Sequence, residues 1–224
     1  HSIQDSEGKL RLEFQTEKGP AAYTYDQVVL AIPFTVLRGV NGIFDLPLGD
    51  FKKRCIREMG YGNNVKTFCS FRHRVWRERL QPAPANGSVF ADEATFQNVW
   101  ETSRGQDGQR GIITNLLAGP RAEAHSGSSL PAYLRELDAV FPGARAAYDG
   151  KSGAMNWPKV PGALGSYSSP LVGQYTWVYK AAALPELDGR LIFAGEHTSQ
   201  VSPGFMNGGV ESGNRAAREI LRGV

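Results

Sequence analysis

The stretch LIFAGEHTSQVSPGFMNGGVESGNRAAREIL, Leu191–Leu221, decides how this sequence folds. Its first three residues are apolar and predict a short buried strand, which a polar loop and then a helix follow. We expect the helix to begin after Pro203 and Gly204. An apolar stripe at helical spacing supports a helix, and its residues are Met206, Val210, Ala217, Ile220 and Leu221. Gly209 and Gly213 are expected to let a backbone approach closely. Because the first turn of the helix faces the loop, its positive end is suited to hold a large anionic cofactor.

The composition indicates a soluble globular protein. With 224 residues, of which 41% are hydrophobic, the chain is long enough for a real core and one or two domains. A net charge of +3 and one short basic segment, Phe71–Arg79, do not favour nucleic-acid binding. No apolar run is long enough to span a membrane, and the first residues lack the apolar region expected of a signal peptide. We expect Cys55 and Cys69 to be free buried thiols, which leaves a cytoplasmic or a secreted, processed protein open.

The periodicity along the chain predicts an α/β (α+β) protein with more strands than helices. A hairpin opens the chain, and a mixed sheet with flanking helices is the simplest arrangement of the middle part. The predicted strands are Lys9–Thr16, Tyr25–Ile32, Asn63–Phe71, Gly87–Ala91, Thr95–Glu101 and Gly111–Leu117, and the predicted helices are Asp50–Met59 and a segment capped by Ser128 or Ser129 that runs to Phe141. In the strand Asn63–Phe71, alternation puts Lys66 on one face with Phe68 and apart from Val65.

The stretch Leu191–Leu221 resembles the closing motif of the flavin-containing amine oxidase family, which includes monoamine and polyamine oxidases and L-amino acid oxidases. The matching residues, in order, are Ala194–Glu196, Thr198, Gly204–Met206, Ser212 with Gly213, and Arg215–Ala217. The resemblance implies the C-terminal part of a two-domain, FAD-dependent amine oxidase fold. Residues 1–43 and 175–224 would then belong to a Rossmann-like FAD domain, of which the second segment supplies the closing strand and helix. Residues 44–174 would form a mixed-sheet substrate domain.

The resemblance also implies how FAD is held. Glu196 would contact the ribityl or pyrophosphate part, and the start of the helix would meet the flavin ring, where negative charge develops on reduction. The residues implied in cofactor binding are Trp157, Gly165, Ser166, Gly195, Glu196, Gly204, Phe205 and Met206. Members that attach flavin covalently use a cysteine where Ser166 stands, so FAD would be bound noncovalently. We expect no metal site, and we interpret His197 as a hydrogen-bonding loop residue.

Three residues are implied in catalysis. Lys66 matches the family's lysine near flavin N5, where it holds a water and assists oxygen chemistry; from the residues alone, a surface lysine is the alternative. Tyr167 and Phe205 would form two aromatic walls that orient a neutral amine. The implied reaction is oxidation of an amine or polyamine to an imine by hydride transfer to flavin N5, with O₂ as the oxidant and H₂O₂ as a product.

The glycine-rich dinucleotide fingerprint does not occur in this sequence. In the family that element is N-terminal, so we expect the chain to be one processed or trimmed fragment of an oxidase that acts with an N-terminal fragment of the same protein. A chain that begins with His1 fits this expectation, and a homo-oligomer of the assembled enzyme is compatible with it. Two alternatives stay open: an L-amino acid oxidase of the same family, and a noncatalytic binding module with a flavin-enzyme fold.

Overall fold

The structure is a computed structural model that describes residues 1–78, 85–91, 95–125 and 129–223. The chain divides into two compact units, His1–Gly62 with Lys159–Val224, and Asn63–Pro158. Residues 44–62 and 159–174, which we expected in a substrate domain, therefore pack with the first unit. The assignment of a cofactor role and a substrate role to these units stays a prediction.

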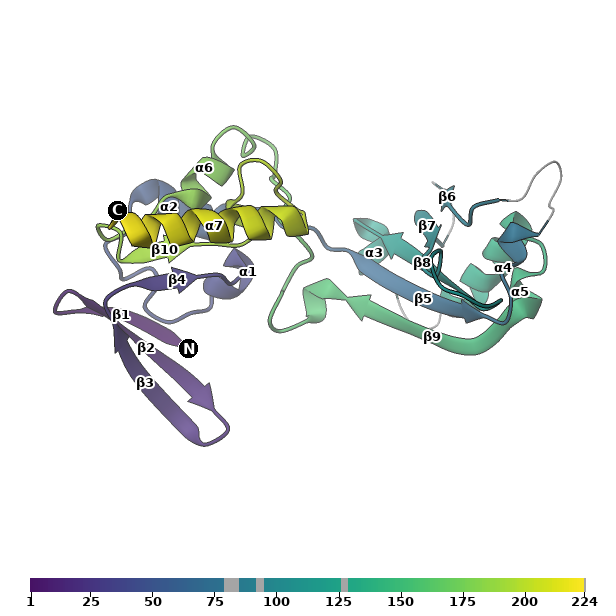
Figure 1. Ribbon diagram of the computed structural model, residues 1–224, viewed down its shortest axis with the longest axis horizontal. Helices are drawn as coiled ribbons and strands as arrows, with labels where there is room; N and C mark the ends of the chain where they lie inside the picture. The colour runs from purple at the N-terminus through teal and green to yellow at the C-terminus, as the bar shows by residue number, and fades with distance from the viewer. Residues whose placement is uncertain (79–84, 92–94, 126–128, 224) are drawn as a thin grey trace. The chain divides into compact units, whose positions relative to one another are not determined.

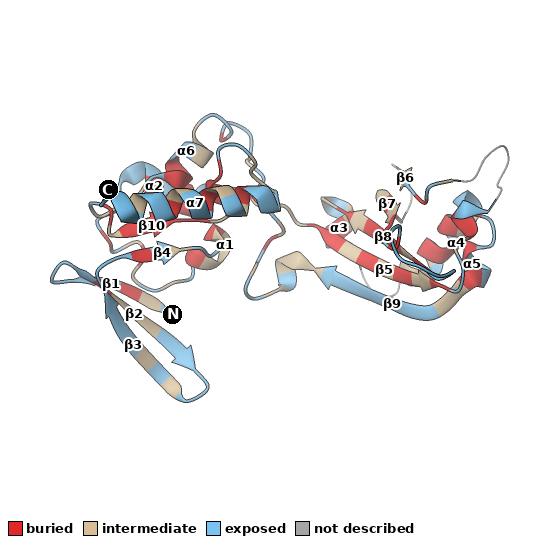
Figure 2. Cartoon of the chain, viewed as in Figure 1, coloured by how far each residue is buried: buried red, intermediate tan, exposed pale blue. Residues whose placement is uncertain are grey.

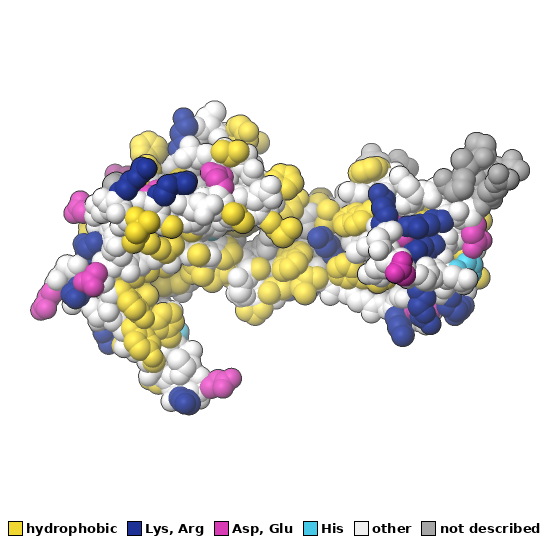
Figure 3. Space-filling view, in the orientation of Figure 1, with side chains coloured by type: hydrophobic (Ala, Val, Ile, Leu, Met, Phe, Trp, Pro, Cys, Tyr) yellow, Lys and Arg dark blue, Asp and Glu magenta, His cyan; other side chains and the backbone are white. Residues whose placement is uncertain are grey.

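The first unit opens with an antiparallel meander of β1 (Ser2–Ser6), β2 (Lys9–Thr16) and β3 (Gly19–Tyr25). Alternation along β2 buries Leu10 in the core, whereas Phe14 near the other end of the strand is largely exposed. The Phe14 ring lies 6.2 Å from that of Tyr23 on β3, and Figure 3 shows hydrophobic side chains gathered over this part of the meander. The predicted opening hairpin is confirmed, and Tyr25 ends its second strand instead of starting the next one.

The rest of the first unit is built on a parallel pair of strands, β4 (Val28–Leu30) and β10 (Leu191–Phe193). All three β10 residues are buried, as expected for an apolar run of this kind. The packed helices, with their bounds in chain order, are α1 (Phe34–Leu37), α2 (Asp50–Glu58), α6 (Val178–Ala183), the 3₁₀ turn η4 (Glu196–Thr198) and α7 (Met206–Arg222) (Figure 1). The predicted helix Asp50–Met59 is confirmed as α2, and β4 is shorter than the predicted strand Tyr25–Ile32.

The closing helix α7 packs on the core through a face of small residues. Its buried residues are Gly208, Ser212 and Ala216, and the outer face in Figure 2 is exposed. The predicted apolar stripe lies on the exposed side of the helix, where Val210 is 66% exposed and Met206 is 90% exposed. Small residues form the buried face because α7 packs closely on β10 and η4, which leaves no room for larger side chains.

The close approach of backbone to α7 occurs at Gly208 and not at Gly209 or Gly213. A Cβ on Gly208 would lie 2.2 Å from the carbonyl oxygen of Ser202. At Gly209 and Gly213 the corresponding position has no atom within 4 Å among the described residues. The prediction of a close contact at Gly209 and Gly213 is therefore wrong, and Gly208 makes the close contact instead.

The second unit contains a sheet in the order β6-β7-β8-β5-β9 (Figure 1). Its strands are β5 (Val65–Phe71), β6 (Val89–Phe90), β7 (Asn98–Glu101), β8 (Gly111–Leu117) and β9 (Tyr148–Asn156). Every pairing in the described part of this sheet is antiparallel, so the expected mixed sheet is not seen there, whereas the α/β class is confirmed. Hairpin connections explain the difference, because they join antiparallel neighbours such as β7 and β8.

The helices of the second unit cover one face of this sheet. They are the 3₁₀ turn η1 (Val75–Arg77), α3 (Pro120–Glu123), α4 (Leu130–Val140) and α5 (Ala144–Ala147). The 3₁₀ turn η3 (Trp157–Lys159) follows β9 at the end of this unit. Cys69 and Ile113 of the sheet pack with Leu137 and Phe141 in one buried cluster. Ser129 stands at the N-cap of α4 without a side-chain capping bond, and Ser128 lies outside the described residues.

Two further expectations concern the whole chain. Cys55 and Cys69 are both free and buried, as predicted. None of the helices in residues 1–78, 85–91, 95–125 and 129–223 has the length and apolar character needed to cross a membrane.

Candidate cofactor-binding site

The candidate site in the first unit begins where β10 ends. Gly195 has a φ of 120°, a value that side chains disfavour. A Cβ at this position would also lie 2.5 Å from Cε1 of His197, so the His197 ring already fills the space beside the backbone. The chain bends here into η4 and brings Glu196 to the start of the loop that leads to α7.

The Glu196 carboxylate joins two segments that are distant in sequence. Its Oε1 accepts a hydrogen bond from the Ser168 amide at 2.8 Å. Its Oε2 accepts one from Ser168 Oγ at 2.7 Å and one from the Gly204 amide at 2.6 Å. Bonds from a carboxylate to backbone amides are strong and directional. Glu196 therefore fixes the segment around Ser168 against the turn that precedes α7, a contact within the protein that the sequence did not predict.

The segment Gly165–Ser168 is held by a second set of backbone bonds. The Ser166 amide donates to the Gly62 carbonyl at 2.8 Å, and the Gly62 amide donates to the Tyr167 carbonyl at 2.9 Å. Gly165 packs against Tyr61, because a Cβ there would lie 2.9 Å from Cβ of Tyr61. The predicted residues Gly165, Ser166 and Tyr167 thus form a short segment held beside Tyr61–Gly62.

These segments enclose a cavity of about 200 Å³ within the first unit. Four of the predicted cofactor residues line it: Gly165, Ser166, Gly195 and Glu196. The remaining lining residues are Ala31, Pro33, Tyr61, Ala163 and His197. Residues far apart in the sequence therefore meet at one concave site, with backbone and small side chains forming much of its wall.

The sequence analysis did not identify Tyr61 as a residue of this cavity. The Tyr61 hydroxyl accepts a hydrogen bond from the Phe34 amide at 2.9 Å, and burial raises the pKa of this phenol. A tyrosine directly after the end of α2 carries no signal for such a role in a single sequence. Its position against Gly165 becomes visible only in the folded chain.

His197 is a packed aromatic ring and not the hydrogen-bonding loop residue that we expected. Its ring centroid lies 4.6 Å from that of Phe34 in an edge-on arrangement. Burial, followed by the positive charges of Lys52 and Arg215, lowers the pKa of His197 to about 4. Its Nε2 has no hydrogen-bond partner among the residues that the structure describes. The ring is therefore neutral at physiological pH and leaves one buried nitrogen unused at the cavity.

Tyr167 and the start of α7 lie close to each other. A Cβ on Gly204 would be 3.7 Å from Cδ2 of Tyr167. Tyr167 is 42% exposed and Phe205 is 69% exposed, so both rings offer accessible faces. Met206 follows as the first residue of α7. The predicted residues Tyr167, Gly204, Phe205 and Met206 thus belong to one surface region of the first unit.

The two other predicted residues, Lys66 and Trp157, belong to the second unit. Lys66 lies on β5, where Val65, Thr67, Cys69 and Phe71 are buried and the residues between them are half-buried. The predicted separation of Lys66 from Val65 is therefore confirmed. The Lys66 Nζ lies 6.0 Å from the ring centroid of Trp100. Trp157 is half-buried in η3, and its amide donates to the Asn64 carbonyl at 3.4 Å.

The described residues contain no group of three or more His, Cys, Asp or Glu side chains that could hold a metal ion. The chemistry of the cavity is instead that of backbone amides, one carboxylate, a neutral imidazole and aromatic rings. Such a set suits an organic cofactor with polar edges and a flat ring system.

The chain shares sequence with known oxidoreductases. YobN of Bacillus subtilis (strain 168), whose name refers to an L-amino-acid oxidase, is 26% identical over 207 residues, which are 90% of this chain and 42% of YobN. Nicotine dehydrogenase of Pseudomonas putida (strain DSM 28022 / S16) is 28% identical over 197 residues, which cover 86% of this chain and 36% of that enzyme. The chain thus spans less than half the length of these relatives.

The fold is similar to that of solved amine oxidases. Cyclohexylamine oxidase from Brevibacterium oxydans IH-35A superposes with a TM-score of 0.83 at 19% identity, over 99% of this chain and 47% of that one. The predicted fold, the C-terminal part of an FAD-dependent amine oxidase, is confirmed by this similarity. The family model for flavin-containing amine oxidoreductases matches residues 1–221. This chain therefore belongs to the flavin-containing amine oxidoreductase family.

Proposed function

We propose that this chain forms part of an FAD-dependent oxidase that converts an amine or polyamine to an imine. The observation that carries the proposal is the cavity of the first unit, which unites Gly165, Ser166, Gly195 and Glu196. Nicotine dehydrogenase, a relative whose name refers to a cyclic amine, supports an amine as the substrate class.

The residues at the cavity fit part of a flavin cofactor. Gly165 and Gly195 leave the wall without projecting side chains, and His197 offers an unpartnered buried Nε2 beside them. A volume of about 200 Å³ accommodates only a portion of a molecule as large as FAD. We assign the cofactor contacts to the predicted residues Trp157, Gly165, Ser166, Gly195, Glu196, Gly204, Phe205 and Met206. Glu196 would act mainly by fixing the amides of Ser168 and Gly204, which it already binds.

The proposal includes noncovalent binding of FAD. Ser166 stands where covalent members have a cysteine, and burial raises the pKa of the Cys55 and Cys69 thiols to about 12. Neither thiol is therefore available as a thiolate near neutral pH. When bound, the flavin supplies N5 as hydride acceptor and passes the electrons to O₂, which gives H₂O₂.

The chain's own residues would orient the amine and a water molecule. Tyr167 and Phe205 present exposed rings, and aromatic faces favour an amine held in one orientation. Phe205 has no hydroxyl, so this wall contributes packing and no proton transfer. Lys66 would hold a water through its ammonium group, and it stands on the half-buried face of β5, away from the core. The imine product is then open to hydrolysis by water.

We include in the proposal an N-terminal fragment that carries the dinucleotide fingerprint. Within the part of the chain that the structure describes, β4 and β10 pair only with each other as a sheet. Val29 on β4 and Val210 on α7 are exposed apolar residues. Apolar surface of this kind is usually covered by further polypeptide. The fragment would supply the pyrophosphate site and cover these residues.

An L-amino acid oxidase is the second candidate, and the similarity to YobN favours it. The two candidates differ in the substrate group beside the amine, which is a carboxylate in an amino acid. The assembled protein should therefore be assayed for H₂O₂ with putrescine, phenethylamine and a set of L-amino acids. If only L-amino acids give H₂O₂, the amine or polyamine proposal is refuted and the second candidate, an L-amino acid oxidase, takes its place.

The flavin role is tested by absorbance and by Lys66→Met. We expect the assembled protein to be yellow, and Lys66→Met to lose most turnover while FAD stays bound. Lys151→Met, at an exposed position on β9, is the matched control and should keep its activity. A protein that carries no flavin, or whose flavin no amine reduces without oxygen, would instead indicate the noncatalytic binding module.

A further inference from the structure

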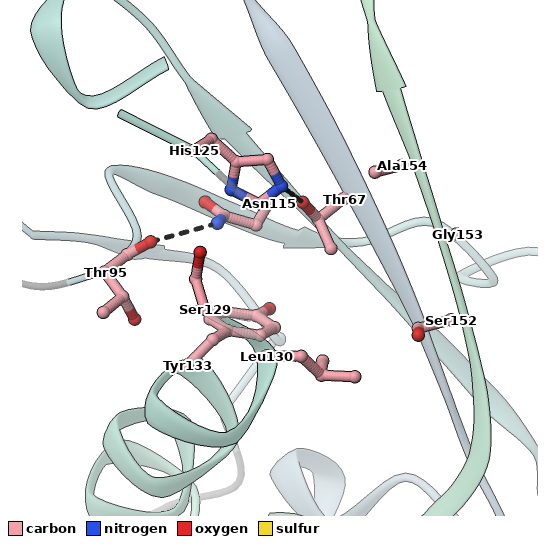
Figure 4. Close-up of a pocket in the computed structure, with 10 residues that line it drawn as sticks. All are labelled: Thr67, Thr95, Asn115, His125, Ser129, Leu130, Tyr133, Ser152, Gly153 and Ala154. Atoms are coloured by element: carbon pink, nitrogen blue, oxygen red, sulfur yellow. Dashed lines mark hydrogen bonds between the residues drawn. The ribbon is translucent and has the colours of Figure 1, made fainter. Parts of the chain in front are cut away.

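The second unit contains a cavity of about 200 Å³ on the core side of its sheet. Figure 4 shows the side chains that surround it, which come from β5, β8, β9, α4 and the segments beside them. Thr67 of β5 is among them, and strand alternation places Thr67 and Lys66 on opposite faces of the sheet. The cavity is therefore distinct from the sheet face on which Lys66 lies.

Two buried polar atoms at this cavity have no hydrogen-bond partner among the described residues. They are Oδ1 of Asn115 and the hydroxyl of Tyr133. The two residues are only 2% and 3% exposed. Native proteins pair nearly all buried polar atoms with protein groups, water or a ligand. These two atoms thus indicate that something occupies the cavity beside them.

Two hydrogen bonds that join lining residues of the cavity to one another are long. Asn115 Nδ2 lies 3.5 Å from the Thr95 carbonyl oxygen, and Thr67 Oγ1 lies 3.5 Å from His125 Nε2 (Figure 4). Both distances are at the outer limit for a hydrogen bond. The polar groups of the wall are therefore only weakly engaged with one another.

The wall favours a neutral occupant. The described residues that line the cavity include no Lys, Arg, Asp or Glu. Burial lowers the pKa of His125 and raises the pKa of Tyr133 well above its usual range, so both groups are neutral at pH 7. A charged ligand would lose its hydration without gaining a counter-charge. Leu130, Ala154 and the Tyr133 ring supply apolar contacts for the rest of a ligand.

We propose that this cavity binds a small neutral molecule with an apolar body and a hydroxyl head group. A hydroxyl can donate to Asn115 Oδ1 and accept from the O–H of Tyr133, which matches both unpartnered atoms. The volume far exceeds that of one water, about 30 Å³, and a cavity of about 150 Å³ admits a benzene ring. The site does not depend on flavin or on turnover, so its test is independent of the proposed oxidase activity.

The test is a titration of the assembled protein, followed by NMR, with phenol as the probe. Toluene has a similar ring without the hydroxyl, and benzoate carries a charge. We expect saturable shifts at Asn115 and Tyr133, with phenol bound about fivefold more tightly than toluene, as one or two hydrogen bonds would give. Equal affinities for phenol and toluene, or preferential binding of benzoate, would refute the proposal.

Variants test separately how the cavity recognises the hydroxyl group and how much space the ligand needs. Tyr133→Phe should reduce the preference for phenol over toluene several-fold, and it removes an unpaired hydroxyl, so it should fold normally. Ala154→Leu should abolish binding of both probes, because Ala154 lines the cavity beside Thr67 and a larger side chain would fill the space. Ala154 is exposed, so the variant should still fold. Tyr148→Phe, which lies outside the cavity, should bind like the wild type. Phenol binding unchanged in both Tyr133→Phe and Ala154→Leu, or a crystal soaked in phenol with only water at this cavity, would overturn the assignment.

Discussion

Replacement of Gly208 by Ala tests how α7 packs against the core. The added Cβ would lie 2.2 Å from the Ser202 carbonyl oxygen and 3.0 Å from Cβ of Ser199. The first contact is with backbone, which cannot rotate away as a side chain would. Overpacking of this kind costs about 1–3 kcal/mol, and the better helix propensity of alanine offsets about 0.5–1 kcal/mol of that cost. We therefore expect Gly208→Ala to lower the free energy of unfolding by about 1–2 kcal/mol.

Gly209→Ala is the matched control in the same turn of the same helix. No described atom lies within 4 Å of the position that its Cβ would take. The substitution should therefore raise the free energy of unfolding by about 0.5–1 kcal/mol, through helix propensity alone. Urea titrations of both variants, followed by circular dichroism, measure the difference. Equal effects of the two substitutions, or a stabilised Gly208→Ala, would refute the packing described for α7.

Gly208→Ala should also alter the candidate site. The Ser202 carbonyl that the new Cβ would displace accepts a hydrogen bond from the Phe205 amide at 3.3 Å. Movement of this carbonyl would therefore shift Phe205, a proposed wall of the amine site. We expect the kcat/KM of the assembled enzyme to fall for Gly208→Ala and to stay near the wild-type value for Gly209→Ala.

Three further predictions concern the ionisable side chains Glu196, Lys52 and His197. Glu196→Ala should lower the free energy of unfolding of the flavin-free protein by about 2–4 kcal/mol, because it leaves the Ser168 and Gly204 amides unpaired; an unchanged midpoint in urea would mean that the carboxylate serves only a ligand. Burial lowers the pKa of Lys52 to about 7, so the unfolded chain binds more protons between pH 7 and 10.5 and stability rises with pH there, by up to about 1.4 kcal/mol per pH unit. Lys52→Met should flatten that rise in urea titrations at several pH values, and a persistent slope would contradict the assignment to Lys52. The lowered pKa of His197, about 4, means that stability is lost as pH falls from 6.5 toward 4; His197→Gln should lose less over this range in acid unfolding, and an identical acid limb would exclude His197 as its source.

The sequence predicts well where local pattern and tertiary packing agree. Strand β5 alternates without exception, so the face of Lys66 follows directly from the order of residues. The apolar run at β10 and the stop of α2 before Gly60 are of the same kind. Motifs also implied Gly165, Ser166, Gly195 and Glu196 as site residues, and all four line the first cavity. Their role in cofactor binding stays a prediction.

The sequence predicts poorly where small or polar residues form the contact. The buried face of α7 consists of Gly208, Ser212 and Ala216, which carry no hydrophobic signal. Strand β9 has exposed residues along most of its length and two glycines, so no periodicity marks it. The position of Tyr61 against Gly165 depends on a contact between residues about a hundred positions apart. Such contacts are set by the folded backbone and leave no trace in hydropathy.

The alternation along strand β5 limits which mutations the protein can tolerate during evolution. Lys66 and Thr67 are sequence neighbours that lie on opposite faces of one sheet. Lys66 lies on the face proposed to take part in the redox reaction, and Thr67 lines the cavity on the other face. Insertion or deletion of a single residue within the strand would exchange the two faces at once. Substitutions can alter either residue separately, but a shift in length cannot. We therefore expect β5 to accept no insertions or deletions, even where the identities of its half-buried residues vary.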